Sequence, residues 1–136
     1  MTRTASRMDP TTRLIRRYWA SCVLSKSNAY GERTVTTPEG KVKALVKQRM
    51  ADDFPSAYRF APVLNGMGSP GLDVYYCVDS LFVAVETKAP GKKPTARQEI
   101  TMTAIRAAGG LVYVVDGVVS CEQMIGDIKE TLEWMP

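Results

Sequence analysis

Asp73, Glu86 and Lys88 combine two carboxylates and an amine in a spacing that suits metal binding and catalysis. Glu86 and Lys88 stand two positions apart at the end of the apolar run Leu81–Val85, so in a strand both side chains project from one face. Two carboxylates about 5 Å apart repel by about 3 kcal/mol at an effective dielectric of about 20, and a Mg²⁺ or Mn²⁺ ion would offset that repulsion because it prefers oxygen ligands. The alternative is an exposed Glu86–Lys88 pair at a strand end, with Asp73 in a turn.

A β-hairpin is the element that must bring Asp73 to Glu86. Leu72–Val78 and Leu81–Lys88 are rich in strand-forming residues, and Asp79–Ser80 between them is a short turn. With that turn, Asp73 falls directly opposite Glu86, where Cβ atoms are roughly 4.5–5.5 Å apart. The sequence therefore predicts a carboxylate pair on one face of a hairpin, with Lys88 beside it.

The composition excludes several mechanisms. The chain has no histidine, which excludes Ser-His-Asp hydrolysis, histidine-based zinc sites and nucleases that use histidine as a base. Its three cysteines, Cys22, Cys77 and Cys121, lie far apart and form no CxxC pair, so we expect neither a disulfide framework nor a zinc site. Cys77 lies in an apolar run and is expected to be a small core residue. Catalysis would have to depend on carboxylates, lysine, hydroxyls or a hard metal ion.

The net charge of +4 is unevenly distributed along the chain. Residues 1–36 carry a net +5, residues 37–110 a net +3 and residues 111–136 a net −4. A basic surface is typical of proteins that bind polyanions such as nucleic acid, although ordinary solvation explains this charge as well. No apolar run approaches the ~18–20 residues of a membrane span, and the N-terminus lacks the apolar core of a secretory signal. We expect a cytoplasmic protein, and its small size suggests a phage or mobile-element origin.

The expected elements alternate between helices and strands around a small sheet. Proline follows a capping residue at Asp9-Pro10 and Thr37-Pro38, which is typical of helix starts, and Gly109-Gly110 is typical of a helix end. The fold class is α/β, a small mixed sheet flanked by helices in the order α-α-β-β-β-α-β-α. The expected helices are 10–25, 37 to about 52, 95–108 and 120–134, the strands are 58–64, 72–78, 81–88 and 111–115, and a glycine-rich loop covers 65–71.

The wider pattern around these residues resembles the PD-(D/E)xK nuclease superfamily and, within it, the VRR-NUC branch. Glu86-Thr87-Lys88 alone would be a weak signature, but the ordered set is more specific. Pro70 departs from the pattern, because it stands three residues before Asp73 whereas the family often has proline immediately before the aspartate. The resemblance covers about residues 37–117 and implies a restriction-endonuclease-like core. We expect 37–136 to form the nuclease domain, and residues 1–36, which fall outside the match, to form a basic helix and linker. The segments that carry it are Gly68–Asp73, Val85–Gly91, Thr95–Gln98 and Gly109–Val115.

The resemblance also implies roles for individual residues. Asp73, Glu86 and the Thr87 carbonyl would be ligands of Mg²⁺ or Mn²⁺, and Lys88 would position or activate the attacking water. Glu39 matches the glutamate of the preceding helix and could hold a second metal ion or its waters; alternatively, it is a helix N-terminal carboxylate favoured by the dipole.

Gln98 matches the glutamine of the helix that follows the hairpin. Thr95-x-x-Gln98 also has the pattern of a capping box at the start of this helix. Gln98 can serve the site and cap the helix at the same time.

The expected substrate is DNA, with branched DNA as one candidate, because stand-alone members of this branch resemble Holliday-junction resolvases that act as homodimers. Lys92, Lys93 and Arg97 are candidates to contact backbone phosphates, or else form a solvated basic loop. The apolar stripe of helix 10–25, which includes Trp19, could form the dimer interface or cover its own core.

Three alternatives stay open: a general, repair or restriction-type endonuclease, a non-catalytic nucleic-acid-binding module, and a structural protein with a chance motif. The resemblance implies no small-molecule cofactor.

Overall fold

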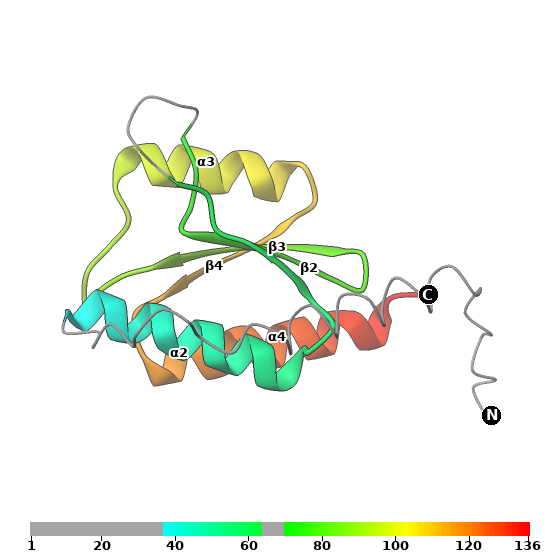
Figure 1. The fold of residues 1–136 in the computed structure, drawn as a ribbon. Coiled ribbons are helices and arrows are strands. Elements are labelled where there is room, and N and C mark those ends of the chain that lie inside the picture. The colour runs from blue at the N-terminus through cyan, green and yellow to red at the C-terminus, as the bar shows by residue number, and fades with distance from the viewer. Residues whose placement is uncertain (1–36, 64–69) are drawn as a thin grey trace. The chain divides into compact units, whose positions relative to one another are not determined.

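A computed structural model of the chain describes residues 37–63 and 70–136. All described elements lie in one compact unit, Thr34–Pro136. The expected helix 10–25 and most of the expected glycine-rich loop lie outside the described residues. In chain order the elements are α2 (Pro38–Asp53), β1 (Tyr58–Phe60), β2 (Val74–Val78), β3 (Leu81–Thr87), α3 (Ala96–Ala107), β4 (Leu111–Val115) and α4 (Val118–Trp134) (Figure 1).

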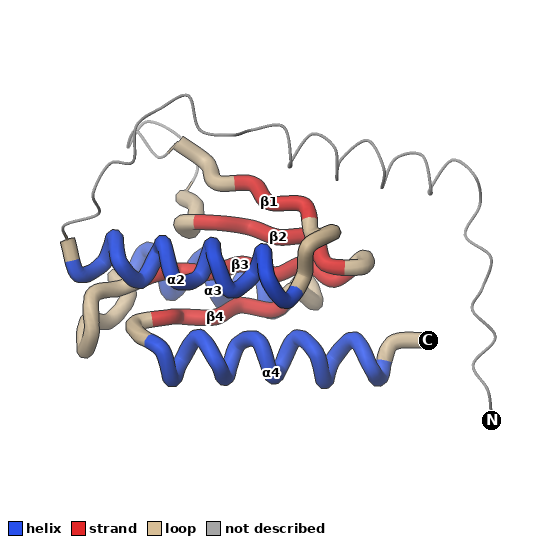
Figure 2. The backbone as a smooth tube through the Cα atoms, turned by 60° about the horizontal axis from the view of Figure 1, so that its bottom comes forward, coloured by secondary structure: helices blue, strands red, loops and turns tan. Residues whose placement is uncertain are grey.

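The four strands form one mixed sheet in the order β1-β2-β3-β4 (Figure 2). β1, β2 and β3 pair antiparallel, and β4 runs parallel to β3. The two-residue turn Asp79–Ser80 has positive φ at both positions, 46° and 75°, as a hairpin turn that matches the twist of its strands requires. Val78 pairs with Leu81, so the predicted hairpin register is confirmed.

Helices cover both faces of the sheet (Figure 1). α2 and α4 pack side by side on one face, and α3 covers the other. The larger core lies under α2 and α4, and a smaller one lies under α3. The expected α/β class is confirmed. Buried residues of the larger core include Val46, Met50, Val83, Val85, Met124 and Ile128, and those of the smaller core are Leu72, Ala84, Met102 and Val112.

A cap places the start of α2 where the sequence predicted it. The Thr37 hydroxyl accepts a hydrogen bond from the Gly40 N–H at 3.1 Å, with Pro38 at the first helical position. At the end of α3, Gly109 adopts a φ of 91°, and Gly110 donates its N–H to the Ile105 carbonyl. A side chain at Gly110 would place its Cβ 2.7 Å from Ile105 Cγ2, so the entrance to β4 requires glycine.

Three strand boundaries, one helix start and one burial prediction differ from expectation. β1 ends at Phe60 rather than continuing toward residue 64, because Pro62 cannot donate to the ladder. β2 begins at Val74 instead of Leu72, β3 ends at Thr87 instead of Lys88, and α4 begins two residues earlier than expected.

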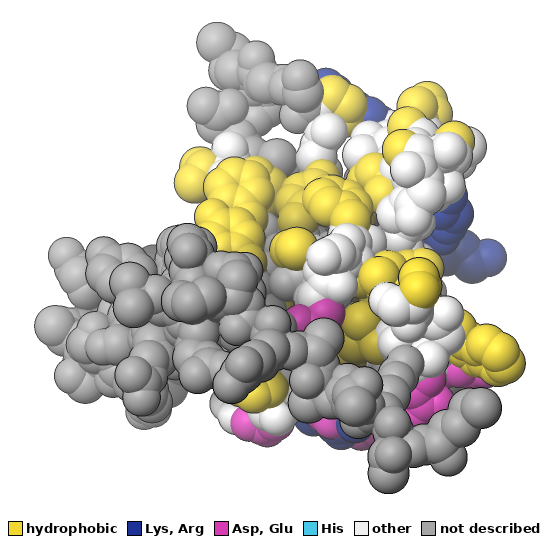
Figure 3. All heavy atoms as spheres, turned by 90° about the vertical axis from the view of Figure 1, so that its right-hand side faces the viewer, with side chains coloured by type: hydrophobic (Ala, Val, Ile, Leu, Met, Phe, Trp, Pro, Cys, Tyr) yellow, Lys and Arg dark blue, Asp and Glu magenta, His cyan; other side chains and the backbone are white. Residues whose placement is uncertain are grey.

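Cys77 is exposed, so its prediction as a core residue is wrong. Strand alternation turns Cys77 away from its buried neighbours Tyr76 and Val78, onto a part of the sheet that also leaves Phe82 exposed. Apolar side chains reach the surface on the side of the molecule where the β2–β3 turn lies (Figure 3). Within the described ranges, no helix is both long enough and apolar enough to span a membrane.

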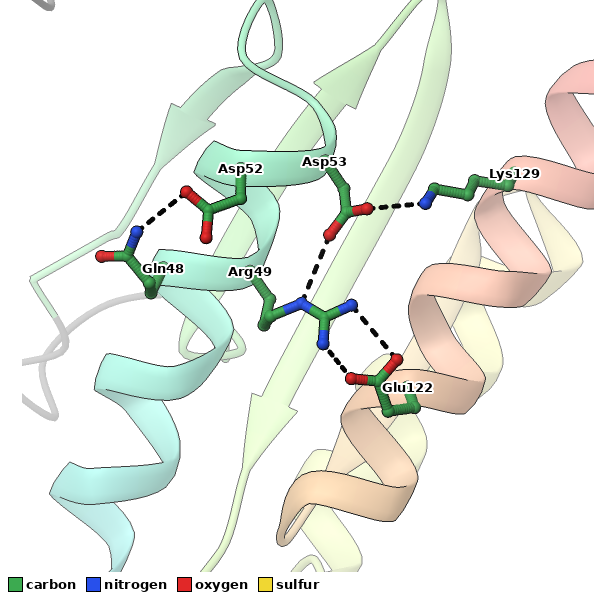
Figure 4. Close-up of polar contacts among 6 residues, drawn as sticks. All are labelled: Gln48, Arg49, Asp52, Asp53, Glu122 and Lys129. Carbon is green, nitrogen blue, oxygen red and sulfur yellow. Dashed lines mark hydrogen bonds and ion pairs between the residues drawn. The ribbon is translucent and has the colours of Figure 1, made fainter.

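An ion-pair network joins α2 to α4 (Figure 4). Lys129 Nζ lies 2.6 Å from Asp53 Oδ1, and Arg49 Nε lies 3.3 Å from Asp53 Oδ2. The Arg49 guanidinium also forms a two-pronged pair with Glu122 of α4. Asp53 therefore connects cations from both helices.

Asp53→Asn should lower the free energy of unfolding by about 1 kcal/mol at pH 7, since partly exposed pairs contribute modestly. The hydrogen bond from Lys129, followed by that from Arg49, lowers the pKa of Asp53. The contribution is therefore present above the ordinary pKa of 3.8 and is lost as the pH falls through the lowered folded value. Urea unfolding from pH 7 to pH 2 measures this. Asp52→Asn is the matched control because Asp52 is exposed and, among the described residues, bonds to Gln48 within α2. An equal loss in both variants would contradict the prediction.

Candidate functional site

Glu86 is a carboxylate inside the protein, 2% exposed, on β3. Its Oε1 accepts hydrogen bonds from Gln98 Nε2 of α3 at 2.6 Å and from Lys88 Nζ at 2.9 Å. Its Oε2 is buried and has no hydrogen-bond partner of normal geometry among the described residues. A buried oxygen without a partner is costly to an apoprotein, so this oxygen is available to a ligand.

The electrostatic environment of Glu86 has opposing contributions. Burial raises its pKa, the hydrogen bond from Lys88 lowers it, and the negative charge of Asp73 raises it again. The backbone N–H of Asp73 also lowers the pKa slightly, although no regular hydrogen bond reaches Oε2. Asp73 is therefore near enough to Glu86 for the two charges to interact, and a cation there would stabilise both ionised forms.

Asp73 lies one residue before β2, at the same end of the sheet. Its Oδ2 accepts hydrogen bonds from the Thr87 N–H at 2.9 Å and from Thr87 Oγ1 at 2.7 Å. Its Oδ1 lies 3.2 Å from Lys43 Nζ on α2. These contacts place the carboxylate against the end of β3.

The predicted direct pairing of Asp73 with Glu86 across the hairpin is not formed. The last pair of the β2–β3 ladder is Val74 with Val85. Beyond that pair, the Asp73 side chain accepts a hydrogen bond from the Thr87 N–H. Glu86 bonds to α3, whereas Asp73 bonds to Thr87 and α2. The carboxylates thus meet at the end of the sheet rather than on one face of it.

Glu39 reaches Asp73 only through Lys43. Lys43 Nζ lies 3.0 Å from Glu39 Oε1 and 3.2 Å from Asp73 Oδ1. Glu39 is in the first turn of α2, and its side chain is 42% exposed. Across residues 37–63 and 70–136, no three acidic or cysteine side chains are grouped closely enough to hold a metal ion together. In this structure Glu39 joins the site as the partner of a lysine.

Gln98 makes both kinds of contact expected for it, as a helix cap and as a neighbour of the candidate site. Its Oε1 accepts the Thr95 N–H at 2.8 Å, and the Thr95 hydroxyl accepts the Gln98 N–H at 3.3 Å, which completes a capping box. Its Nε2 donates to Glu86. The start of α3 therefore fixes the orientation of the buried carboxylate.

The donor set fits a hard divalent cation. Asp73 and Glu86 offer carboxylate oxygens, the atoms that Mg²⁺ and Mn²⁺ prefer, and Glu86 Oε2 has no other partner among the described residues. Lys88 offsets the charge of Glu86 from its other oxygen, Oε1, and Lys43 offsets the charge of Asp73 from Oδ1.

The basic loop after β3 lies next to this end of the sheet in the chain. Lys92, Lys93 and Arg97 are exposed, and none of them forms an ion pair with another described residue. Asp116, just after β4, anchors the loop by accepting the Gly91 N–H at 3.3 Å. The hydrogen bond from Ser120, followed by that from Gly91, lowers the pKa of Asp116, so it remains an anion.

Sequence reasoning missed two residues of this region, Lys43 and Asp116. The spacing of Glu39 and Lys43, four residues apart on one helix, was an available signal for their pair. No sequence signal indicated that Lys43 would also reach Asp73.

Comparison with known proteins gives one informative likeness. No protein-family model matches the chain, and no curated protein matches it. A solved structure described as a VRR_NUC domain is similar, with a TM-score of 0.58 and 22% sequence identity over 67% of this chain and 97% of that chain. At this identity the likeness shows the fold, which agrees with the predicted one. The chain has the fold of a VRR_NUC domain, a restriction-endonuclease-like α/β fold with three described helices around a four-stranded mixed sheet.

Proposed function

We propose that residues 37–136 form a metal-dependent nuclease domain that hydrolyses phosphodiester bonds. The observation that carries the proposal is the buried Glu86 carboxylate, which has one oxygen without a partner among the described residues and lies beside Asp73 and Lys88. A purely structural glutamate would gain nothing from this arrangement, since burial raises its pKa and disfavours its charge. The fold shared with a VRR_NUC domain supports the same function.

Asp73, Glu86 and the Thr87 carbonyl are the groups that would hold Mg²⁺ or Mn²⁺. The chemistry such an ion supplies is a lowered pKa of bound water and compensation of charge on the phosphate. Asp73 is held against Thr87 by two hydrogen bonds, so its orientation is set before a ligand binds. Gln98 does the same for Glu86.

Lys88 is the proposed residue for orienting the nucleophile and offsetting negative charge as it develops on the phosphate. Its ammonium lies 2.9 Å from Glu86 Oε1, and its side chain is 14% exposed, so it can reach a substrate at the surface without leaving the carboxylate. Because Lys88 pairs with Glu86, its ammonium is held in place beside the carboxylate.

The proposed substrate is DNA, and the specific form of the proposal is a branched DNA cut by a homodimer in the manner of a junction resolvase. The exposed Lys92, Lys93 and Arg97 support backbone contacts, since none is paired with another described residue. Residues 37–110 carry a net positive charge that would favour a polyanion.

A nuclease assay on linear, nicked, flapped and four-way DNA tests the function. The purified full chain should cut at least one substrate with Mg²⁺ or Mn²⁺ and none with EDTA. Preference for the four-way junction would support the resolvase form, and equal cutting of all substrates would favour a general endonuclease. Binding without cleavage under both metals would contradict the enzyme proposal and favour a nucleic-acid-binding module.

A further inference from the structure

Lys43 occupies the space between two carboxylates of the proposed site. Its ammonium lies 3.0 Å from Glu39 Oε1 and 3.2 Å from Asp73 Oδ1, so a single cation already joins the two acids. Glu39 is one helical turn before Lys43, and Asp73 lies one residue before β2, so α2 and the segment that leads into β2 meet at this ammonium.

We propose that Lys43 serves as a fixed cation that takes the place of a second divalent ion and limits the centre to one metal. This rests on the proposed function, because it presupposes that Asp73 and Glu86 bind an ion. A metal ion that bridged Glu39 Oε1 and Asp73 Oδ1 would occupy the place of the Lys43 ammonium, and two cations cannot share that space without strong repulsion.

The charge balance of the group agrees with one ion. Glu39, Asp73 and Glu86 contribute three negative charges, and Lys43 and Lys88 contribute two positive ones. One divalent ion brings this group from −1 to +1, whereas two would bring it to +3. Replacing Lys43 by a neutral residue makes the group one charge unit more negative. The more negative group should then attract a second divalent ion.

The two lysines also hold different oxygens. Lys88 bonds Glu86 Oε1 and leaves Oε2 without a partner among the described residues, whereas Lys43 holds Oδ1 of Asp73 while Thr87 holds Oδ2. The oxygen of Asp73 that faces α2 is therefore occupied, and the oxygen of Glu86 is open. A first ion can bind Glu86 without displacing Lys43, but a second ion on the Glu39 side cannot.

The test counts Mn²⁺ ions bound to the purified full chain, by the electron paramagnetic resonance signal of free Mn²⁺ during titration. Wild type should bind one ion and Lys43→Gln two, and removing the nearby positive charge should tighten the first site by about tenfold. Glu39→Gln combined with Lys43→Gln should return the count to one. Lys47→Gln, an exposed lysine one turn further along α2, is the matched control and should behave as wild type.

Two results would overturn the inference. One is that wild type binds two Mn²⁺ ions, and the other is that Lys43→Gln binds one ion with wild-type affinity. If the glutamine variant melts early, Lys43→Met provides the same loss of charge and is judged by the same count. The two proposals can be distinguished by their failures. Only the role of Lys43 is refuted if wild type cuts DNA and binds one ion and the Lys43 variant binds Mn²⁺ as wild type does. A wild type that neither binds Mn²⁺ nor cuts DNA refutes both.

Discussion

Glu86→Gln should reduce metal-dependent DNA cleavage by about 100- to 1000-fold, the range seen when a group that stabilises developing charge is lost. Glutamine has nearly the same shape and can still accept the hydrogen bond that Gln98 donates to Oε1 at 2.6 Å. It cannot supply an anionic oxygen, and the oxygen that has no other described partner is the one replaced by an amide nitrogen. The variant should therefore lose the ion while it keeps the fold, as measured by cleavage rates and by Mn²⁺ binding.

Glu86→Gln should also be as stable as wild type or more stable at pH 7. Burial raises the folded pKa of Glu86 above its ordinary value of 4.5. The wild-type protein therefore loses stability as the pH rises from that ordinary value to the raised folded value. Glutamine has no such titration, and its advantage should grow from acid to neutral pH. Glu99→Gln, on the exposed side of α3, is the matched control and should cleave as wild type does. Cleavage by Glu86→Gln within tenfold of wild type would remove Glu86 from the proposed centre.

The arrangement of the elements was accessible from the sequence because each element carries its own local signals. The caps at Thr37 and Thr95 and the glycine pair at 109–110 determine helix ends through hydrogen bonds between residues close in the chain. The turn Asp79–Ser80 sets the hairpin register in the same local way. These features depend on neighbours within a few residues, so they can be derived without knowing the tertiary structure.

The contacts within the site could not be derived in the same way because they depend on where an element ends. Starting β2 one residue after Asp73 frees its carboxylate to bond Thr87, so the expected cross-strand pair with Glu86 is replaced. The Lys43 contact requires the position of α2 over the sheet, which is set by core packing. Cys77 was misassigned for a similar reason, since the sequence does not say how much of one sheet face α3 covers.

Lys88→Met should lower the free energy of unfolding by about 2–3 kcal/mol at pH 7, because it leaves the Glu86 carboxylate buried without its ammonium partner. Methionine keeps most of the length and apolar contact of the lysine stem. The loss has an upper limit, since Glu86 can take up a proton instead. Protonating a carboxyl with an ordinary pKa of 4.5 at pH 7 costs about 3.4 kcal/mol, at about 1.36 kcal/mol for each of 2.5 pH units.

The pH dependence and a double-variant cycle separate this effect from lost packing. Without Lys88 the pKa of Glu86 rises further, and a carboxyl whose folded pKa exceeds its unfolded value loses stability as the pH rises, so the deficit should be small near pH 4 and largest at pH 7. Combining Lys88→Met with Glu86→Gln should recover most of the loss, because no buried charge then remains. Lys92→Met, in the exposed loop, is the control. A deficit that is independent of pH and unchanged in the double variant would contradict this prediction. It would mean that Lys88 stabilises the protein through packing of its aliphatic stem, and that the Glu86 carboxylate does not need the charge of Lys88.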